Sequence, residues 1–369
     1  MAKKKKVVGE FGDFLKDMKK NNAGIESLDT QAESGFISTG SYALNAILSG
    51  NIHNGIINNK TVALIGESNC GKSFVLAQIV KCAIEDGYVC MIFDSERAVD
   101  KHYYERIGAD ITKIIRIPVT QIMEFRNIAL EAIRKFKERY PDQKLLVGVD
   151  SMGNMAGSKE VADAEAGKYA ADMGTTAKQM NSAFRVLNGE VDKYNCPLIF
   201  TNHVYVDPSA MFQGRGTMAG GSKLIYNSHQ IIYFTKAQLK EDLVNEEGKK
   251  KATKIGLYMN ASTVKNRVVP EEQHASLEVR FRDGVNKYYG LLNYALGSGA
   301  IQKNPSGNGY FVPHLNKVVQ TKKLYCDEVF TPEVLEQLNE YLGDNNQFAS
   351  FAKTDIDKIE KDIEGDIVE

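Results

Sequence analysis

The chain has 369 residues, of which 43% are hydrophobic and 25% charged, and its formal net charge is -1. This length and apolar content allow one large core with a smaller satellite domain. No apolar run is long enough to span a membrane, and the near-neutral balance gives no sign of a protein that binds nucleic acid through its overall charge.

The cysteines indicate a reducing compartment. There are five of them, an odd number, and no two form a CxxC pair. Free thiols are therefore expected rather than a disulfide framework or a zinc site. The N-terminus is polar and basic, with no apolar segment typical of a secretory signal. We expect a soluble cytoplasmic protein, with no membrane partner.

Residues 1–35 are polar and basic and include one short amphipathic stretch. Lysines occupy positions 3–6, and "FGDFLKDMKK" follows soon after. Its apolar side chains, Phe11, Phe14, Leu15 and Met18, can share one face of a helix. Such a short helix is marginal alone, so it needs a surface to dock on, in its own chain or in a neighbour.

From about residue 36 to 290, apolar strands alternate with helices. Strands are predicted at residues 61–66, 88–96, 145–151 and 196–203, and helices at 72–87, 124–140 and 175–194. Three strand-like runs then follow one another at 229–236, 253–263 and 276–284. The alternation predicts an α/β fold with a mostly parallel sheet covered on both faces, and the last runs predict an antiparallel extension.

The C-terminal region divides into two parts. A small mixed domain is expected over residues 289–343, after a core that ends near residue 288. Residues 344–369 form an acidic tail, in which positions 355–369 hold seven acids against Lys358 and Lys361. Such a tail can compete with a polyanion for basic surfaces elsewhere in the chain.

A phosphate-binding loop stands between the first strand and the first helix. The stretch "GESNCGKS" begins at the strand end and opens the helix, so its N–H groups can cradle phosphate oxygens. Lys72 supplies charge to the β- and γ-phosphates, and the Ser73 hydroxyl can bind Mg²⁺. The whole predicted cradle is Gly66, Glu67, Ser68, Asn69, Cys70, Gly71, Lys72 and Ser73.

Cys70 occupies a loop position where the backbone does the cradling, so we interpret it as a tolerated small residue. The alternative is a reactive thiol, because a helix N-terminus and Lys72 can lower the pKa of a cysteine.

Three carboxylates end the neighbouring strands. Asp150 ends "LLVGVD", where it can reach Mg²⁺ through water. Hydrolysis also needs a group that orients or deprotonates the attacking water, and Asp94 and Glu96 both end "CMIFDSE". Alternation along a strand puts these two on the same face, so the pattern alone does not choose between them.

The order of the motifs resembles that of the RecA-type recombinases, and especially the UvsX-like recombinases of tailed phages. "ISTGSYALNAILSG", the phosphate loop, "FDSERAVDKHYYERIGAD", "VGVDSMGNMA", "FTNH" and "MAGGSKLIYNS" follow in the family's order, from about residue 36 to 297. The resemblance implies a RecA-type P-loop ATPase core that binds ATP and Mg²⁺.

The resemblance implies roles for single residues. Glu96 matches the family's catalytic glutamate, which favours it over Asp94. Asp100 and Tyr103 match residues that hold the adenine. His203 lies where RecA has a glutamine that senses the γ-phosphate, and an imidazole can donate to a phosphate as well. Without the resemblance, His203 is equally a hydrogen-bonded structural residue.

"STVKNRVVPE" resembles the segment whose basic residues reach the ATP of the neighbouring subunit. Lys265 and Arg267 match those two positions. Arginine stands where RecA has lysine, and its planar guanidinium can hold phosphate oxygens bidentately. The alternative is a pair of exposed basic residues at a strand end.

Two Gly- and Ala-rich stretches, at about 153–171 and 204–221, match the family's DNA-binding loops. Without the resemblance, both are equally surface loops. Lys178 and Arg185 lie seven residues apart on the following helix, hence on nearly one face, and match residues that contact DNA phosphates. The second stretch contributes Phe212, Arg215, Gly220 and Gly221.

These matches imply an ATP-dependent recombinase that forms head-to-tail filaments on single-stranded DNA and pairs it with duplex DNA. A single-strand-binding protein and a loading mediator are implied as partners. The rivals are a hexameric RecA-fold helicase or motor and an ATP-gated DNA-coating scaffold with little turnover. The ordered set of loops argues against the first rival, and Glu96 against the second.

Overall fold

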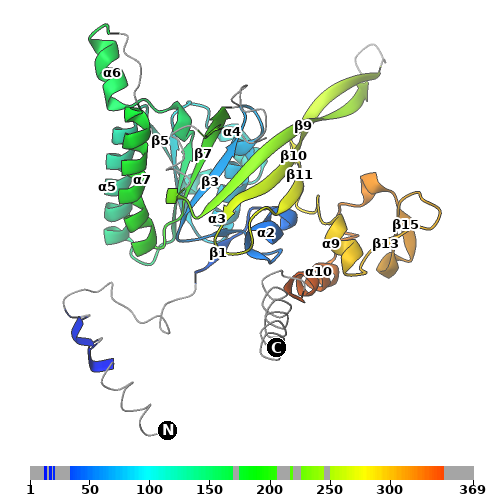
Figure 1. Cartoon of the computed structure of the whole chain (residues 1–369). Helices are drawn as coiled ribbons and strands as arrows, with labels where there is room; N and C mark the ends of the chain where they lie inside the picture. The colour runs from blue at the N-terminus through cyan, green and yellow to red at the C-terminus, as the bar shows by residue number, and fades with distance from the viewer. Residues whose placement is uncertain are drawn as a thin grey trace, which may run out of the picture. The chain divides into compact units, whose positions relative to one another are not determined.

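The computed structural model describes residues 12–14, 16–18, 20, 34–168, 174–205, 217–218, 226–244 and 250–344. By its internal contacts the chain divides into residues 1–35 and residues 36–369 (Figure 1). In the first unit, residues 12–14 and 16–18 are helical, and Phe14 and Met18 are exposed. The other two members of the expected apolar face, Phe11 and Leu15, lie outside the described residues.

One large sheet organises the second unit. Its spatial order is β12-β11-β10-β9-β3-β7-β6-β4-β5, with β8 beside β7. The bounds in chain order are β3 Thr61–Gly66, β4 Val89–Asp94, β5 Ile114–Pro118, β6 Leu145–Asp150, β7 Leu198–Tyr205, β8 Thr217–Met218, β9 Gln230–Val244, β10 Lys250–Asn266, β11 His274–Arg280 and β12 Gly284–Val285. From β9 to β5 the neighbours are parallel, and from β9 to β12 they are antiparallel. The predicted parallel sheet with an antiparallel extension is confirmed.

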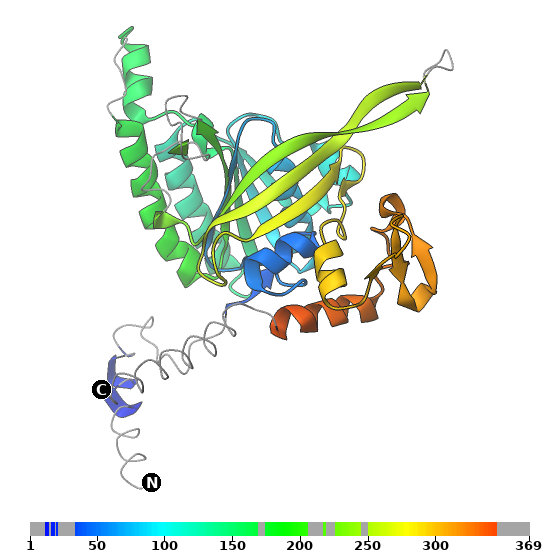
Figure 2. The same ribbon diagram turned by 45° about the vertical axis from the view of Figure 1, so that its right-hand side comes forward.

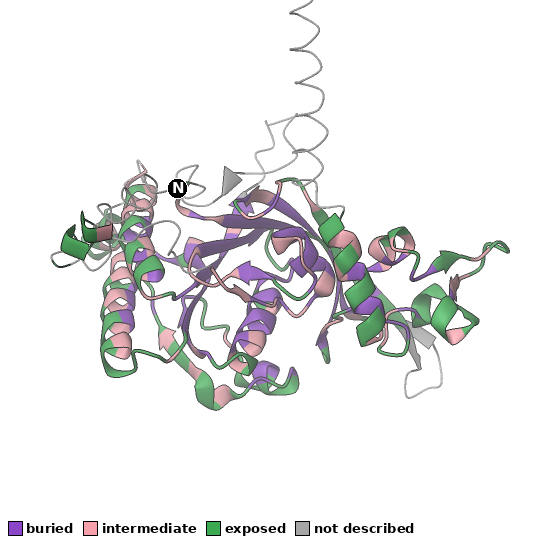
Figure 3. Cartoon of the chain, turned by 90° about the horizontal axis from the view of Figure 1, so that it is seen from below, coloured by how far each residue is buried: buried purple, intermediate pink, exposed green. Residues whose placement is uncertain are grey.

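Helices cover both faces of this sheet because alternate side chains of a buried strand point to opposite sides. On β3, Val62 and Leu64 join one apolar cluster, whereas Ala63 and Ile65 join the other. The first cluster includes α2 Tyr42–Ser49, α3 Lys72–Glu85 and α4 Lys101–Arg106, and the second includes α5 Ile122–Arg139 and α7 Thr175–Lys193. Figure 2 shows α5 and α7 together on one side of the sheet, and Figure 3 shows its strands buried between the helices.

Some elements had no counterpart among the expected ones. They are β1 Phe36–Ile37, β2 Ile56–Ile57, α2, α4, β5 and α6 Ser158–Glu165. The expectation of a loop at about 153–171 is wrong for residues 158–165, which form α6. The first turn of α6 is supported by a bond from the Gly157 amide to the Glu160 carboxylate. α6 buries none of its residues, so its sequence carries no apolar period that could predict it.

Residues beyond β12 form a small mixed region on the sheet's flank. It contains α9 Leu292–Gly297, β13 Gln302–Lys303, β14 Tyr310–Val312, β15 Lys317–Val319 and α10 Pro332–Asp344. Leu291, Ala295 and Leu338 from this region belong to the same apolar cluster as α2 and α3. The boundaries expected at 35, 288 and 343 remain predictions, and the acidic tail after residue 344 lies outside the described residues.

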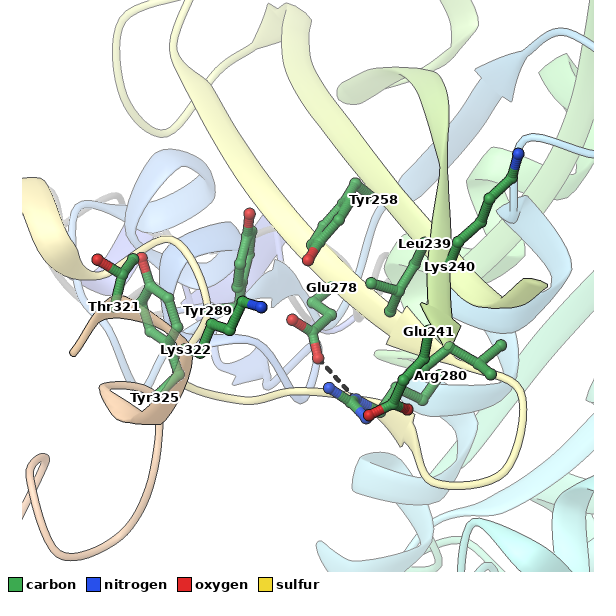
Figure 4. Close-up of a pocket in the computed structure, with 11 residues that line it drawn as sticks. Leu239, Lys240, Glu241, Tyr258, Glu278, Arg280, Tyr289, Thr321, Lys322 and Tyr325 are labelled. Atoms are coloured by element: carbon green, nitrogen blue, oxygen red, sulfur yellow. Dashed lines mark hydrogen bonds and ion pairs between the residues drawn. The ribbon is translucent and has the colours of Figure 1, made fainter. Parts of the chain in front are cut away.

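A cavity of about 350 Å³ separates this region from the sheet (Figure 4). Tyr289 joins its two walls, because its ring centroid lies 5.5 Å from that of Tyr258 on β10 and 4.8 Å from that of Tyr325. At its floor Arg280 Nε donates to Glu278 Oε1 at 2.8 Å. Aromatic pairs of this kind contribute roughly 0.5–1.5 kcal/mol each beyond their buried area, so the tyrosines help to dock the C-terminal region on the sheet.

In the ranges that the structure describes, no helix is both long and apolar enough to cross a membrane.

Candidate active site

The loop between β3 and α3 requires glycine at both of its ends. A side chain at Gly66 would place its Cβ 2.4 Å from the carbonyl oxygen of Phe234 on the adjacent strand. Gly71 has φ +98°, a left-handed conformation that glycine adopts without strain, and it lies against Met259 of β10. The loop is thus pressed close to β9 and β10, with Glu67, Ser68 and Asn69 exposed between the two glycines. Its amides and the N-terminus of α3 are suited to an anion.

Lys72 begins α3 and is only 6% exposed. Its Nζ donates to the carbonyl oxygens of Gly66 at 3.0 Å and Glu67 at 2.7 Å. Burial lowers the pKa of this ammonium, and the nearby Cys70, Asp150 and Glu96 act against that shift. A cation is therefore held inside the loop by groups that an incoming phosphate can replace.

Cys70 is 1% exposed, with its Sγ 3.7 Å from Lys72 Nζ. Burial raises the pKa of the thiol above its usual value, and the opposing effects of Lys72 and Lys236 are smaller. The alternative of a lowered thiol pKa is therefore wrong. The sequence shows the neighbouring charge, which lowers the pKa, but not the burial, which raises it.

Labelling should reflect this burial. With N-ethylmaleimide near neutral pH, we expect Cys70 to react at least about tenfold more slowly than the half-buried Cys326 in the folded protein. Peptide mapping by mass spectrometry after timed quenching measures both rates in one sample. If Cys70 reacts faster than Cys326, the interpretation of Cys70 as a reactive thiol would be correct after all.

The carboxylate at the end of β6 lies next to the first turn of α3. Asp150 Oδ1 accepts from Thr201 Oγ1 at 2.6 Å, and the carboxylate also accepts from the Ser73 hydroxyl. Burial raises the pKa of Asp150, and those two bonds oppose the shift. A carboxylate and a hydroxyl side by side are hard oxygen ligands of the kind that Mg²⁺ prefers. Within the described residues no three acidic, His or Cys side chains converge on a metal, so such an ion would share its shell with phosphate and water.

Asp94 and Glu96, which strand alternation alone did not separate and between which the family resemblance favoured Glu96, have different environments. The Asp94 side chain is fully buried and accepts from Arg116 Nη2 at 2.6 Å and from the amides of Ala98 and Val99. The Glu96 side chain is 36% exposed and lines the cavity beside the loop. Asp94 therefore fixes the turn after β4, and Glu96 is the carboxylate that can reach a water in the cavity.

A chain of polar contacts links Glu96 to the phosphate loop. Its Oε1 accepts from Ser151 Oγ at 2.7 Å and lies 3.3 Å from His203 Nε2. The other ring nitrogen of His203 lies 3.3 Å from Ser68 Oγ. His203 thus stands between the phosphate loop and Glu96.

The cavity around these groups has a volume of about 800 Å³, within the range of small-molecule sites. Its far side is lined by Phe74, Lys254, Leu257 and Phe281, none of which the sequence pattern singled out. The Phe74 and Phe281 rings lie 5.8 Å apart, and Lys254 Nζ lies 5.5 Å from the Phe281 ring. This side offers an aromatic surface for a planar base.

Asp100 and Tyr103, expected at the adenine, do not line this cavity. The Asp100 carboxylate accepts from the His102 amide at 2.8 Å and caps α4. The Tyr103 ring is 8% exposed and packs on Phe74 at 4.9 Å between centroids. Tyr103 is therefore one side chain removed from the cavity, and its buried hydroxyl oxygen has no partner among the described residues.

Lys265 and Arg267 also lie away from this cavity. Lys265 pairs with Ile231, which pairs with Ala63 inside β3, whereas the phosphate loop begins at Gly66. Lys265 Nζ donates to the Tyr226 carbonyl at 3.3 Å, and burial together with Arg267 lowers its pKa.

Arg267 is exposed, and its Nη1 lies 3.5 Å from Nε2 of His229. Burial and this guanidinium lower the pKa of His229 to about 4. The two cations therefore form a basic patch toward the opposite end of β3 from the chain's own phosphate loop.

The DNA-binding candidates are only partly described. Lys178 and Arg185 are exposed on α7, whose opposite face buries Met180, Phe184 and Leu187 against α5 and the sheet. The candidates of the second stretch lie outside the described residues: Phe212, Arg215, Gly220 and Gly221.

The model of the RecA N-terminal domain family matches residues 16–286. A "Recombination and repair protein" of Enterobacteria phage T4 is 29% identical over 266 residues, which cover 72% of this chain and 64% of the phage protein. A "Protein RecA" of Helicobacter pylori is 26% identical over 340 residues, covering 91% and 90% of the two chains. A "Protein RecA" of Nitratiruptor is 28% identical over 304 residues, covering 82% of each.

Proposed function

The chain belongs to the RecA N-terminal domain family, and from this premise we propose that it is an ATP-dependent recombinase that assembles on single-stranded DNA and exchanges strands. The observation that carries the proposal is the convergence of Lys72, the Ser73–Asp150 pair and Glu96 on one cavity beside the phosphate loop. The cytoplasm is the location we propose, because the five cysteines are free thiols.

The loop and its neighbours would bind the nucleotide. The loop amides donate to phosphate oxygens, and Lys72 exchanges its carbonyl partners for them. Ser73 and Asp150 would hold Mg²⁺, which when bound would neutralise phosphate charge. Phe74 and Phe281 take the base, while Asp100 and Tyr103 can contribute to the adenine site only if α4 or the Tyr103 ring shifts.

Glu96 is the proposed base for hydrolysis. Its carboxylate lies in the cavity with Ser151 on one oxygen, and it accepts the proton of the attacking water. His203 contacts both Glu96 and the loop, so loss of the terminal phosphate would alter its contacts. β7 runs on from His203 to Tyr205, so that change would pass to the second DNA-binding stretch.

Lys265 and Arg267 are proposed to serve the ATP site of a neighbouring protomer. Their distance from their own phosphate loop along the sheet supports this role, because a finger residue must reach a site built by another chain. If basic residues at one end of a protomer complete the ATP site at the other end of the next protomer, the contact is head-to-tail. Such contacts form an open helix when they do not close into a ring. The N-terminal segment is the proposed second part of that contact.

DNA would bind mainly through its backbone. Lys178 and Arg185 on α7, together with the two stretches at 153–171 and 204–221, are the proposed contacts. Such binding is independent of sequence and weakens with salt. Single- and double-stranded DNA are the proposed substrates, and a single-strand-binding protein and a loading mediator are the proposed partners.

The deciding experiment measures ATP hydrolysis and assembly together. We expect single-stranded DNA to stimulate hydrolysis by about tenfold or more and electron microscopy with ATP to show open helical filaments. Closed rings that unwind duplexes would favour the hexameric motor. Filaments without DNA-stimulated turnover or strand exchange would favour the coating scaffold.

A further inference from the structure

The phosphate loop is held from outside by a second lysine. Lys236 of β9 donates from Nζ to the carbonyl oxygen of Ser68 at 2.8 Å and to that of Asn69 at 3.1 Å. Lys72 takes the two preceding carbonyls, those of Gly66 and Glu67. Four consecutive carbonyl groups of the loop therefore accept hydrogen bonds from two ammonium groups.

The sheet register explains how a residue so distant in sequence reaches the loop. Gly66, the last residue of β3, pairs with Phe234 of β9. β3 stops there and the chain turns into the loop, but β9 continues to Val244. Lys236 lies two residues beyond Phe234, on the same face of the strand, so its side chain stands beside the turn. Met259, the β10 partner of Lys236, packs against Gly71 at the other end of the loop.

We propose that Lys236 is a positioning residue for the phosphate loop. A loop that binds an anion must turn its N–H groups toward the anion and its carbonyls away, because a carbonyl oxygen repels phosphate oxygens. Lys72 cannot hold carbonyls once its ammonium moves to a bound phosphate. Lys236 points at the loop from β9 and does not line the nucleotide cavity, so it keeps the Ser68 and Asn69 carbonyls turned outward in both states.

The first test follows the loop itself and needs no nucleotide. In the full-length Lys236→Met variant, amide hydrogen exchange over residues 66–73 should be about fivefold faster than in the wild type, because the loop opens more often. Lys240→Met is the matched control, since Lys240 lies on the same strand but lines the cavity beside Tyr258. It removes the same charge and should leave exchange in the loop unchanged. Lys236→Arg should restore most of the protection.

The second test follows nucleotide binding, and this part rests on the proposed function. Lys236→Met should raise the dissociation constants of ATP and ADP by about tenfold, measured with fluorescent analogues, while kcat at saturating ATP stays within about twofold. A general loss of folding would instead lower kcat and the melting temperature together.

The outcomes separate the two claims. Unchanged loop exchange and unchanged nucleotide affinity in Lys236→Met overturn the positioning role. If loop exchange is faster in Lys236→Met but the wild-type protein itself binds no ATP, the role of Lys236 in the loop stands. The proposed function is then overturned.

Discussion

Replacing Glu96 with glutamine is expected to lower ATP turnover by about 100-fold to 10,000-fold while ATP and single-stranded DNA still bind. The amide keeps the shape of the side chain and its contact with Ser151, but it cannot accept the proton of the attacking water. Steady-state hydrolysis with and without DNA, together with nucleotide binding by fluorescence, measures the two effects separately.

Two comparison variants make this result specific. Glu131→Gln removes a carboxylate that pairs with Lys135 on the surface of α5, and it should hydrolyse ATP at the normal rate. Asp94→Asn should instead lower the melting temperature, because Asp94 is buried and its charge pairs with Arg116. Undiminished hydrolysis in Glu96→Gln would transfer the role of base to another group.

Replacing Arg267 with alanine is expected to lower DNA-stimulated turnover by about 1,000-fold, the scale on which arginine fingers act. The guanidinium lies outside its own cavity, so each Arg267→Ala protomer keeps an intact phosphate loop, Asp150 and Glu96. Nucleotide binding to the isolated protomer should therefore be normal. Arg126→Ala controls for the loss of one arginine, because the half-buried Arg126 of α5 donates to its neighbour Asn127 and does not line the cavity.

A mixing experiment then decides whether Arg267 acts on a neighbour. Equal amounts of Arg267→Ala and Glu96→Gln, each inactive alone, should regain turnover when mixed. In about a quarter of randomly formed interfaces, an intact Glu96 faces an intact Arg267. If both residues served the same protomer's ATP, no mixture would recover activity.

Local patterns in the sequence were sufficient to predict much of the fold and of the candidate site. The buried strands β3 and β6 and the loop between β3 and α3 could be predicted because each depends on residues that are close in the chain. The same holds for Asp150, since parallel strands bring their carboxyl ends to one edge. Alternation failed for Asp94 and Glu96 because β4 ends at Asp94 and the chain bends before Glu96.

Contacts between distant segments could not be predicted in this way. Lys236 reaches the loop across 168 residues of sequence, through a strand register that no local pattern encodes. Phe281 follows β11 and reaches the cavity only because that strand joins the sheet through β10. The burial of Cys70 and Tyr103 is likewise a property of packing, so a thiol placed beside a lysine and a helix N-terminus can still have a raised pKa.

β9 also sets the spacing between two functional points of the sheet. Its residue 236 supports the chain's own phosphate loop, and its residue 231 pairs with Lys265 on the basic patch. Five residues of strand set these points about 17 Å apart. Inserting one residue between them would turn one of the two to the wrong face of the sheet, and inserting two would keep both faces but lengthen the spacing by about 7 Å. In the proposed assembly, where Lys265 and Arg267 serve a neighbour's ATP site, the helical repeat would therefore depend on the spacing of these two points along β9.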